Sequence, residues 1–361
     1  MSSPKSPKSP AKSPKSPPKS RSPSAGAASP AGDLLGAGDA PIEVDAADGD
    51  SVYAQSTVTD TTSLRSSILD FKWENGRRYH AYQEGSYWGP NDERQQEAED
   101  ILHEMYRLVL DNKLQLAPLG DDVQRVLDVG CGTGAWAIDF ADENPAAEVV
   151  GVDLSPIQPN FLPPNCKFEV DDLIQDWTYP EDHFDFIHVR FMTGCIPDWV
   201  EFYKKAMRRM KPGGWIEHVE LSSIARSDDG SLKPDTALVK WADIFQKIGA
   251  ATGKSFSISE TAPDLIREAG FTNIQHRTLK IPIGTWPKDR TLKHWGAWNR
   301  QFLLQAIEGL SIRGLTEILG WTFEEAQLYL VQIRADITDP KIHSYIEMIV
   351  VDGQRPEEAG E

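Results

Sequence analysis

The sequence has few cysteines and no long apolar run. Its three cysteines, Cys131, Cys166 and Cys195, are an odd number, lie far apart and form no Cys-x-x-Cys pair. This pattern indicates neither a disulfide framework nor a zinc site, and it favours a reducing compartment. No apolar run approaches the roughly 18 residues needed to cross a bilayer, and the N-terminus lacks the apolar segment of a signal peptide. We therefore expect a protein of the nucleus, the cytoplasm or both, with no membrane segment.

Acidic residues are absent from residues 1–30, which carry six basic residues, most of them in repeated Ser-Pro-Lys units. Such a composition buries too little apolar area to offset the entropy of ordering, so we predict that residues 1–64 form a disordered tail. The repeats suit proline-directed kinases, and a basic tail of this kind could contact nucleic-acid phosphates. A solubilising spacer is the third interpretation.

The rest of the chain is acidic. From residue 31 onward, 31 basic residues stand against 55 acidic ones. General nucleic-acid binding by this part is disfavoured, because it would approach a polyanion against repulsion. Metal binding is not expected either, since the clustered aspartates Asp171, Asp172 and Asp176 do not match a calcium loop and the histidines have no zinc spacing.

What the chain does have is the stretch VLDVGCGTG at residues 126–134. Its first apolar residues predict a buried strand, and residues 135–143, AWAIDFADE, predict a helix. Between them lies a turn that side chains would obstruct, with glycine at Gly130, Gly132 and Gly134. A strand, glycine turn and helix bring backbone N–H groups and the positive end of a helix dipole against a ligand carboxylate or phosphate.

The glycine turn alone does not name the ligand, because Gly130, Gly132 and Ala135 also satisfy the relaxed dinucleotide pattern. A second apolar strand, in VVGVDLS, ends at Asp153, where a carboxylate can accept hydrogen bonds from ribose hydroxyls. An NAD enzyme could use the same aspartate. The chain has no Tyr-x-x-x-Lys pair, which disfavours an NAD-dependent oxidoreductase.

The run DVGCGTG resembles motif I of the class I S-adenosylmethionine (SAM) methyltransferases, and further landmarks follow it in order. These are a third strand in KFEVDDLIQDW, a fourth in HFDFIHVRFM and a fifth in KPGGWIEHVEL. The resemblance covers roughly residues 92–225. It implies an α/β fold with a Rossmann-like, seven-stranded sheet whose last strand is antiparallel, and with the ligand at the carboxyl ends of the strands.

The same resemblance implies the cofactor, SAM, and a set of residues that bind it. The acidic residue after the third strand usually binds the adenine amino group, and by position this is Asp172, with Asp171 as the alternative. Arg190, near the end of the fourth strand, resembles a family position beside the cofactor, and a core ion pair is its alternative role. The predicted set is completed by the three glycines and Asp153 together with Asp128, Leu154 and Leu173.

Several helices and two late strands are predicted around this series. A helix over residues 92–115 opens with an Asn-Asp cap, and another follows the fifth strand at residues 233–253. The helix in SETAPDLIREAGF is expected to be capped by Ser259 and ended by Gly270. A strand in NIQHRTLKIPIG, a helical section over about 290–335 and a last strand in YIEMIVVDGQR complete the order. The helical insertions should cap the substrate pocket of a methyltransferase domain over 121–361.

A narrower resemblance rests on residues 76–99, GRRYHAYQEGSYWGPNDERQQEAE, together with GTGAWAIDFADE and FDFIHVRFM. These runs look like the fungal LaeA-like methyltransferases, and the likeness spans most of the chain from Phe71 onward. The family includes nuclear regulators of secondary metabolism and development that work with velvet proteins. It also includes enzymes of biosynthetic clusters that methylate an N or O atom of a small molecule. A third possibility is a SAM-binding partner subunit with little turnover.

Residues 65–120 are expected to form a lid segment and a helix. Tyr82, with Tyr79, Tyr87 and Trp88, would either cover the cofactor, where aromatic rings attract a sulfonium, or attach the segment to the domain. Because a sulfonium is an activated leaving group, orientation is the main catalytic demand. The sequence identifies no general base. We expect structural roles for two sets of residues: the histidines His80, His188, His218 and His294, and the core aromatics Trp295, Trp298 and Phe302.

Overall fold

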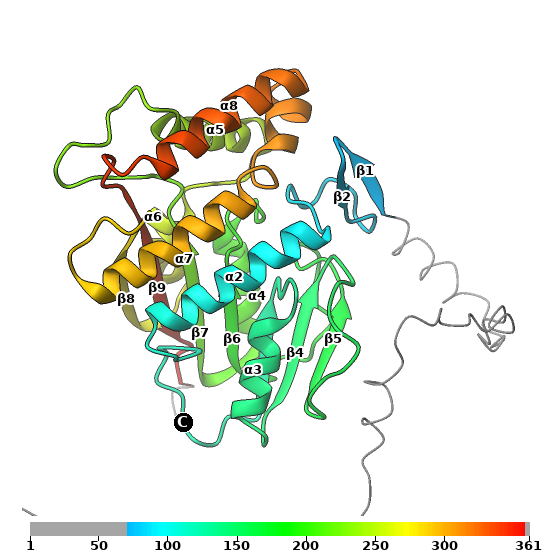
Figure 1. Cartoon of the computed structure of the whole chain (residues 1–361). Helices are drawn as coiled ribbons and strands as arrows, with labels where there is room; N and C mark the ends of the chain where they lie inside the picture. Colours follow the sequence, from blue (N-terminus) through cyan, green and yellow to red (C-terminus); the bar gives the residue numbers. More distant parts are fainter. Residues whose placement is uncertain (1–70, 358–361) are drawn as a thin grey trace, which may run out of the picture. The chain divides into compact units, whose positions relative to one another are not determined.

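The computed structural model describes residues 71–357. The predictions for the Ser-Pro-Lys tail and for the acidic stretch that follows it lie outside these residues. Within the described part the predicted α/β class and the seven-stranded sheet are confirmed (Figure 1). The strand order is β5-β4-β3-β6-β7-β9-β8.

The first five strands of this sheet are parallel, and the late pair reverses direction. The parallel strands are β3 (Arg125–Val129), β4 (Glu148–Asp153), β5 (Cys166–Val170), β6 (Phe184–Arg190) and β7 (Met210–Leu221). Strand β9 (Tyr345–Gln354) is antiparallel to both β7 and β8 (Thr272–Pro282). Because all five parallel strands end at one edge of the sheet, the residues that follow them gather there.

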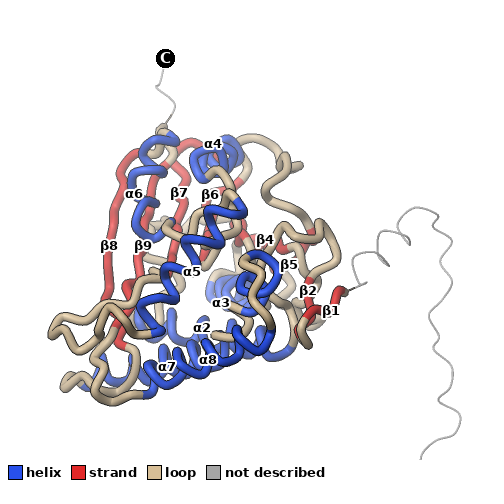
Figure 2. The backbone as a smooth tube through the Cα atoms, turned by 90° about the horizontal axis from the view of Figure 1, so that it is seen from above, coloured by secondary structure: helices blue, strands red, loops and turns tan. Residues whose placement is uncertain are grey.

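Helices cover both faces of the sheet (Figure 2). On one face α4 (Trp199–Arg209) and α6 (Ile258–Ala269) pack over side chains of β3, β6 and β9. The other face carries α2 (Glu93–Val109), α3 (Ala135–Glu143) and α7 (Arg290–Ala306). A further layer of α5 (Ala237–Thr252), the π-helix η1 (Gly314–Ile318) and α8 (Phe323–Thr338) lies at the top of Figure 1.

The N-terminal segment contains a short hairpin that the sequence did not indicate. Strands β1 (Lys72–Glu74) and β2 (Arg77–Tyr79) pair antiparallel around Asn75 and Gly76, both of which have positive φ. Residues 80–92 connect the hairpin to α2, and part of this connection lies beside the residues that follow β3 and β4. None of the helices in residues 71–357 is long and apolar enough to span a bilayer.

Three boundaries differ from the predictions. The helix expected over 92–115 ends at Val109, because Asp111 and Asn112 adopt the left-handed conformation. The N-cap of α6 is Ser257 rather than Ser259, since Ile258 is already helical and fully buried in the core. The helical section over 290–335 is broken into α7, η1 and α8. Each boundary is set by local backbone conformation or side-chain packing, which the spacing of apolar residues does not predict.

Candidate active site

A cavity of about 1010 Å³ lies beside the turn that follows β3. We call it the glycine-turn cavity. The three turn glycines have φ values of 65°, 54° and 81°, at Gly130, Gly132 and Gly134, which side chains rarely adopt. A Cβ on Gly130 would lie 2.2 Å from Met192 Sδ. The turn therefore needs glycine both for its backbone conformation and for its close approach to neighbouring groups.

Asp153 at the end of β4 is bound to this turn. Its Oδ2 accepts the Gly132 N–H at 2.9 Å, and its Oδ1 accepts the Ser155 N–H at the same distance. Burial raises the pKa of Asp153 to about 6, against the effect of these hydrogen bonds. The carboxylate is thus fixed in position at the cavity wall, as its place after an apolar strand predicts.

A second carboxylate, which the sequence analysis missed, faces the same turn from α2. Glu99 Oε1 accepts a hydrogen bond from Gln95 Nε2 at 3.3 Å, while Oε2 has no hydrogen-bond partner among residues 71–357. Burial, followed by the nearby Asp153, raises the pKa of Glu99 to about 8. A Cβ on Gly132 would lie 2.8 Å from Oε2. The acceptor faces a space that this glycine leaves open.

The loop after β5 forms another part of the wall. The Asp171 N–H donates to the Asp153 carbonyl at 3.1 Å, and Asp171 Oδ1 accepts the Asp172 N–H at 2.8 Å. Asp172 is buried, and its Oδ1 accepts the Ile174 N–H at 3.0 Å. The predicted residues Leu154 and Leu173 line the cavity beside these aspartates. The ends of three parallel strands therefore meet around one space.

Comparison with known proteins identifies the family. A family model described as a methyltransferase domain matches residues 101–276. The methyltransferase pytC of Aspergillus terreus is 39% identical over 87% of this chain and 96% of its own length. The secondary metabolism regulator LAE1 of Cochliobolus heterostrophus is 36% identical over 79% of this chain and 95% of its own.

A third relative, the protein-methionine methyltransferase laeA of Emericella nidulans, is 34% identical over 81% of this chain and 79% of its own length. The chain belongs to the LaeA-like family of class I SAM-dependent methyltransferases. Among solved structures, a phosphoethanolamine N-methyltransferase of Haemonchus contortus has a TM-score of 0.45 at 14% identity, over 82% of this chain and 73% of its own.

SAM fits the donor set that this LaeA-like chain presents. Gly130 and Gly132 line the cavity without side chains, so a ligand can approach the backbone of the turn closely. The carboxylates of Asp153 and Glu99 suit a ligand that carries hydroxyls and positive charge. The unpartnered Glu99 Oε2 is the observation that points most directly to a missing donor.

Arg190 lies at the end of β6, and its polar partner is a histidine of α2 rather than the carboxylate of the expected core ion pair. It lines the glycine-turn cavity, and its guanidinium donates to His103 Nδ1 at 3.2 Å from both terminal nitrogens. His103 Nε2 in turn donates to Asp139 Oδ2 at 3.0 Å. The guanidinium also lies over the ring of Tyr106, 4.9 Å from its centroid. Arg190 is thus held rigidly by α2 at the end of β6.

Three of the predicted cofactor residues are not among those that line the cavity within the described part of the chain. Asp128 is buried in the sheet, where its Oδ1 accepts from His188 Nδ1 at 2.8 Å. Gly134 shapes the start of α3, because a Cβ there would lie 2.3 Å from Phe168 Cζ. Tyr82 contributes its carbonyl to His80 Nδ1 at 2.6 Å. These residues stand behind the cavity wall.

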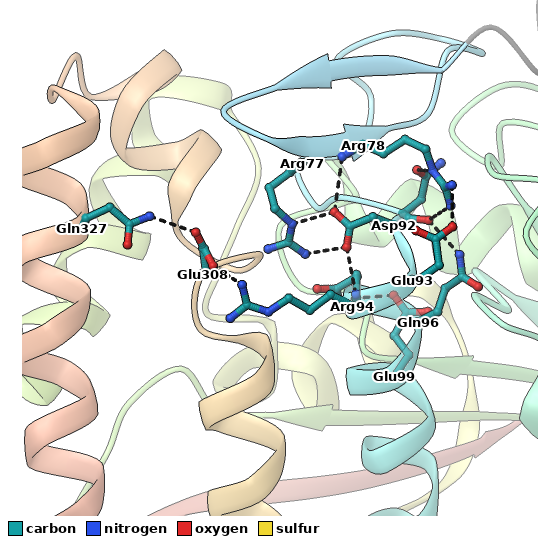
Figure 3. Close-up of polar contacts among 11 residues, drawn as sticks. Arg77, Arg78, Asp92, Glu93, Arg94, Gln96, Glu99, Glu308 and Gln327 are labelled. Atoms are coloured by element: carbon teal, nitrogen blue, oxygen red, sulfur yellow. Dashed lines mark hydrogen bonds and ion pairs between the residues drawn. The ribbon is translucent and has the colours of Figure 1, made fainter.

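Other aromatic residues of the predicted lid reach the site. Tyr87 lines the glycine-turn cavity, and the Trp88 indole N–H donates to the Thr193 carbonyl at 3.1 Å. Figure 3 shows the polar contacts that hold this segment, with Arg77 paired to Asp92 at 2.6 Å. The same figure shows Arg94 paired with Glu308, which also accepts from Gln327 Nε2 at 2.9 Å. The lid segment is therefore attached to the start of α2, and α2 is linked through Glu308, in the turn after α7, to α8.

The four histidines weighed for catalysis make protein hydrogen bonds. His188 stacks on Trp136, with ring centroids 3.7 Å apart, and burial lowers its pKa to about 4. His218 accepts from the Tyr203 hydroxyl at 2.6 Å, and His294 Nε2 accepts from the Trp298 indole at 3.2 Å. No group of three or more His, Cys, Asp or Glu within residues 71–357 is arranged to hold a metal ion.

Proposed function

We propose that this protein transfers the methyl group of SAM, bound in the glycine-turn cavity, to an acceptor and thereby regulates fungal secondary metabolism and development. The single observation that carries the chemical part is the turn of Gly130 and Gly132 opposite the carboxylates of Asp153 and Glu99. When bound, SAM supplies a methyl group on a sulfonium, which needs no acid or metal to activate its departure.

The residues of the cavity bind and orient this cofactor. Asp153 accepts hydrogen bonds from ribose hydroxyls, and the loop of Asp171 and Asp172 receives the adenine. Glu99 places a second carboxyl group beside Asp153, and a bound cation favours the ionised form of this group. Orientation of the acceptor can supply about 7–11 kcal/mol of the barrier reduction, so the absence of an assigned general base is compatible with turnover.

The regulatory part of the proposal is supported by the relatives and by the tail. Two of them are named as secondary metabolism regulators, from Cochliobolus heterostrophus and Aspergillus flavus. The Ser-Pro-Lys repeats suit a nuclear protein whose tail is phosphorylated. A nuclear location and a velvet-type partner belong to the same proposal. Deletion of the gene should change transcripts of several biosynthetic clusters, whereas the loss of one metabolite alone would contradict a regulatory role.

A methyltransferase of one biosynthetic cluster is the second candidate. It is supported by the 39% identity to pytC and by an apolar cavity next to the cofactor site. The third, a SAM-binding subunit with little turnover, shares every cofactor residue with the other two. Methyl transfer is therefore the property that separates it from them.

Calorimetric titration with SAM and with NAD⁺ tests the cofactor assignment. We expect micromolar binding of SAM and none of NAD⁺. Radiolabelled SAM then reports turnover with nuclear proteins and with fungal metabolites as acceptors. No binding of SAM at millimolar concentration would overturn the enzyme assignment, and binding without any transfer would favour the partner subunit.

A further inference from the structure

A second cavity, of about 570 Å³, lies beside the first, between the end of β7, α5 and α7. We call it the apolar chamber. Its walls are dominated by aromatic side chains: Trp88, Phe191, Trp241, Phe245, Phe256 and Phe302. No Asp, Glu, Lys, Arg or His of residues 71–357 lines it, and its few polar residues are Thr193, Ser222 and Ser223.

The aromatic walls are packed against one another and keep a fixed shape. Phe245 stacks on Phe256 with ring centroids 5.2 Å apart, and Trp88 contacts Phe256 at 5.4 Å. Trp241 lies 5.1 Å from Phe245, and its indole N–H donates to Ser311 Oγ at 2.9 Å. Three separate parts of the chain, the lid segment, α5 and the loop before α6, thus build one preformed cavity.

Among the described residues, Phe191 alone lines both the apolar chamber and the glycine-turn cavity. It follows β6 with φ of 55°, a conformation that is unusual for a bulky side chain. Its ring lies edge-to-face on Phe302 with centroids 6.0 Å apart. The two cavities are therefore neighbours that meet at this one aromatic side chain.

The strained turn that carries Phe191 is held by hydrogen bonds from several elements. The Phe191 N–H donates to the Val219 carbonyl at 3.1 Å, and the Met192 N–H donates to Glu220 Oε1 at 2.5 Å. The Gly194 N–H donates to the Ser255 carbonyl at 2.9 Å. Strained residues persist only where the surroundings over-determine them, and they cluster at sites of function. Here the strain places a ring at the boundary between the two cavities.

We propose that the apolar chamber binds the methyl acceptor, and that this acceptor is an uncharged small molecule with an aromatic ring and one O–H or N–H group. The proposal rests on the SAM-dependent activity proposed above. The ring would pack among the aromatic walls while its heteroatom passes Phe191 toward the glycine-turn cavity. A charged peptide side chain or a phosphate ester is disfavoured, because the chamber offers a buried charge no partner.

The transfer step balances with the groups named. A lone pair of the acceptor oxygen or nitrogen forms the new bond to the methyl carbon as the carbon–sulfur bond of SAM breaks. The electron pair of the broken bond stays on sulfur, which gives S-adenosylhomocysteine. The proton of the O–H or N–H group is lost to water. No oxidant or metal is required.

The full chain should be titrated with 2-naphthol and, as a charged analogue of the same ring size, 2-naphthalenesulfonate. We expect 2-naphthol to bind at least tenfold more tightly, because only the uncharged probe enters the chamber without losing hydration of an ion. Equal affinities, or tighter binding of the sulfonate, would overturn the proposal. This comparison uses the unaltered protein and does not depend on the folding of any variant.

A chamber-filling substitution localises the probe. Ala225→Phe adds a ring to the chamber wall, and Leu238→Phe is a second such variant if the first does not fold. Either should weaken 2-naphthol binding at least tenfold while SAM affinity stays within twofold. Ala251→Phe, at an exposed position on α5, is the matched control and should change neither. Undiminished 2-naphthol binding in a folded chamber variant would place the probe elsewhere and refute the assignment.

Radiolabelled SAM and fungal extract then test the acceptor class. The label should appear in small molecules that an organic solvent extracts, and the chamber variant should lose it. Label found only in protein would refute a small-molecule acceptor. If SAM does not bind at all while 2-naphthol still does, the proposed function fails but the chamber remains a binding site, so the two failures are distinguishable.

Discussion

The two cavities of this molecule are lined by different kinds of chemical groups. The glycine-turn cavity is lined by a glycine turn and by carboxylates that follow parallel strands, whereas the apolar chamber is lined by packed aromatic rings. The first suits a polar, charged ligand, and the second suits an apolar one. Their boundary is a single strained residue, Phe191, so the fold brings a polar and an apolar compartment together where a methyl group would pass.

The lid segment belongs to both compartments, since Tyr87 lines the first and Trp88 the second. Its attachment depends on the buried pair of Arg77 and Asp92, and Asp92 also caps α2 by accepting the Gln95 N–H at 3.0 Å. Asp92→Ala should lower the free energy of unfolding by about 3–5 kcal/mol, because it leaves a buried guanidinium without its partner. Denaturant titration measures this, and binding of both SAM and 2-naphthol should weaken.

Asp198→Ala is the matched control for that change. Asp198 caps α4 by accepting the Glu201 N–H at 3.0 Å but lies at an exposed position without a buried guanidinium. Asp198→Ala should lower the free energy of unfolding by only about 1 kcal/mol. If both substitutions cost the same, the ion pair adds nothing beyond the cap, and the lid would not be attached as we describe.

Only one of the two compartments was predictable from the sequence. The turn glycines, Asp153 and Asp172 are close together in the sequence or follow apolar strands, so strand order alone brings them together. Glu99 was missed because a helix carboxylate is usually solvated, although its spacing from Gln95 and Leu102 places it on the buried face of α2. The chamber was missed because Trp88, Trp241 and Phe302 meet only through tertiary packing. Tyr82 was chosen over Tyr87 since spacing cannot tell which ring turns inward.

Gly132→Ala should affect the glycine-turn cavity alone. The added Cβ would lie 2.8 Å from Glu99 Oε2 in a backbone conformation with φ of 54°. We expect SAM affinity to fall roughly 100-fold, about 2.7 kcal/mol, with 2-naphthol binding unchanged. Gly230→Ala is the control, since Gly230 has φ of 69° but no atom within 4 Å of a Cβ. An equal loss of SAM affinity in both variants would show that backbone strain is responsible, and not the contact of the added Cβ with Glu99.

The raised pKa values of Glu99 and Asp153 should make SAM binding depend on pH. Burial raises the pKa of Glu99 from an ordinary value of 4.5 to about 8 in the folded chain, so this group is largely protonated near pH 6. A bound cation favours the carboxylate and expels its proton, so affinity should rise by up to tenfold per pH unit from pH 6 to 8. Glu99→Gln should flatten this dependence, and Glu104→Gln, at an exposed position on the same helix, should preserve it.

The same raised pKa fixes the sign of the effect on stability. Between pH 4.5 and 8 the folded chain holds the Glu99 proton more tightly than the unfolded chain does, so this group makes folding less favourable as pH rises. Glu99→Gln should therefore raise the melting temperature more at pH 8 than at pH 5. A variant whose melting temperature falls at pH 8 would mean that the charged carboxylate has a partner and is not awaiting a ligand.

The smallest expected effect concerns the apolar chamber alone. Trp88→Phe removes the indole N–H that donates to the Thr193 carbonyl and leaves an aromatic ring in the wall. We expect a loss of about 1 kcal/mol in unfolding free energy and a severalfold weaker binding of 2-naphthol, with SAM affinity unchanged. Trp286→Phe removes a similar bond, to the Ser344 carbonyl at 3.0 Å, but lies outside the chamber wall. Trp286→Phe should lower the free energy of unfolding as much as Trp88→Phe does, but it should leave 2-naphthol binding unchanged. If Trp88→Phe weakens SAM instead, the lid acts on the cofactor and the division between the two compartments is not as sharp as their linings indicate.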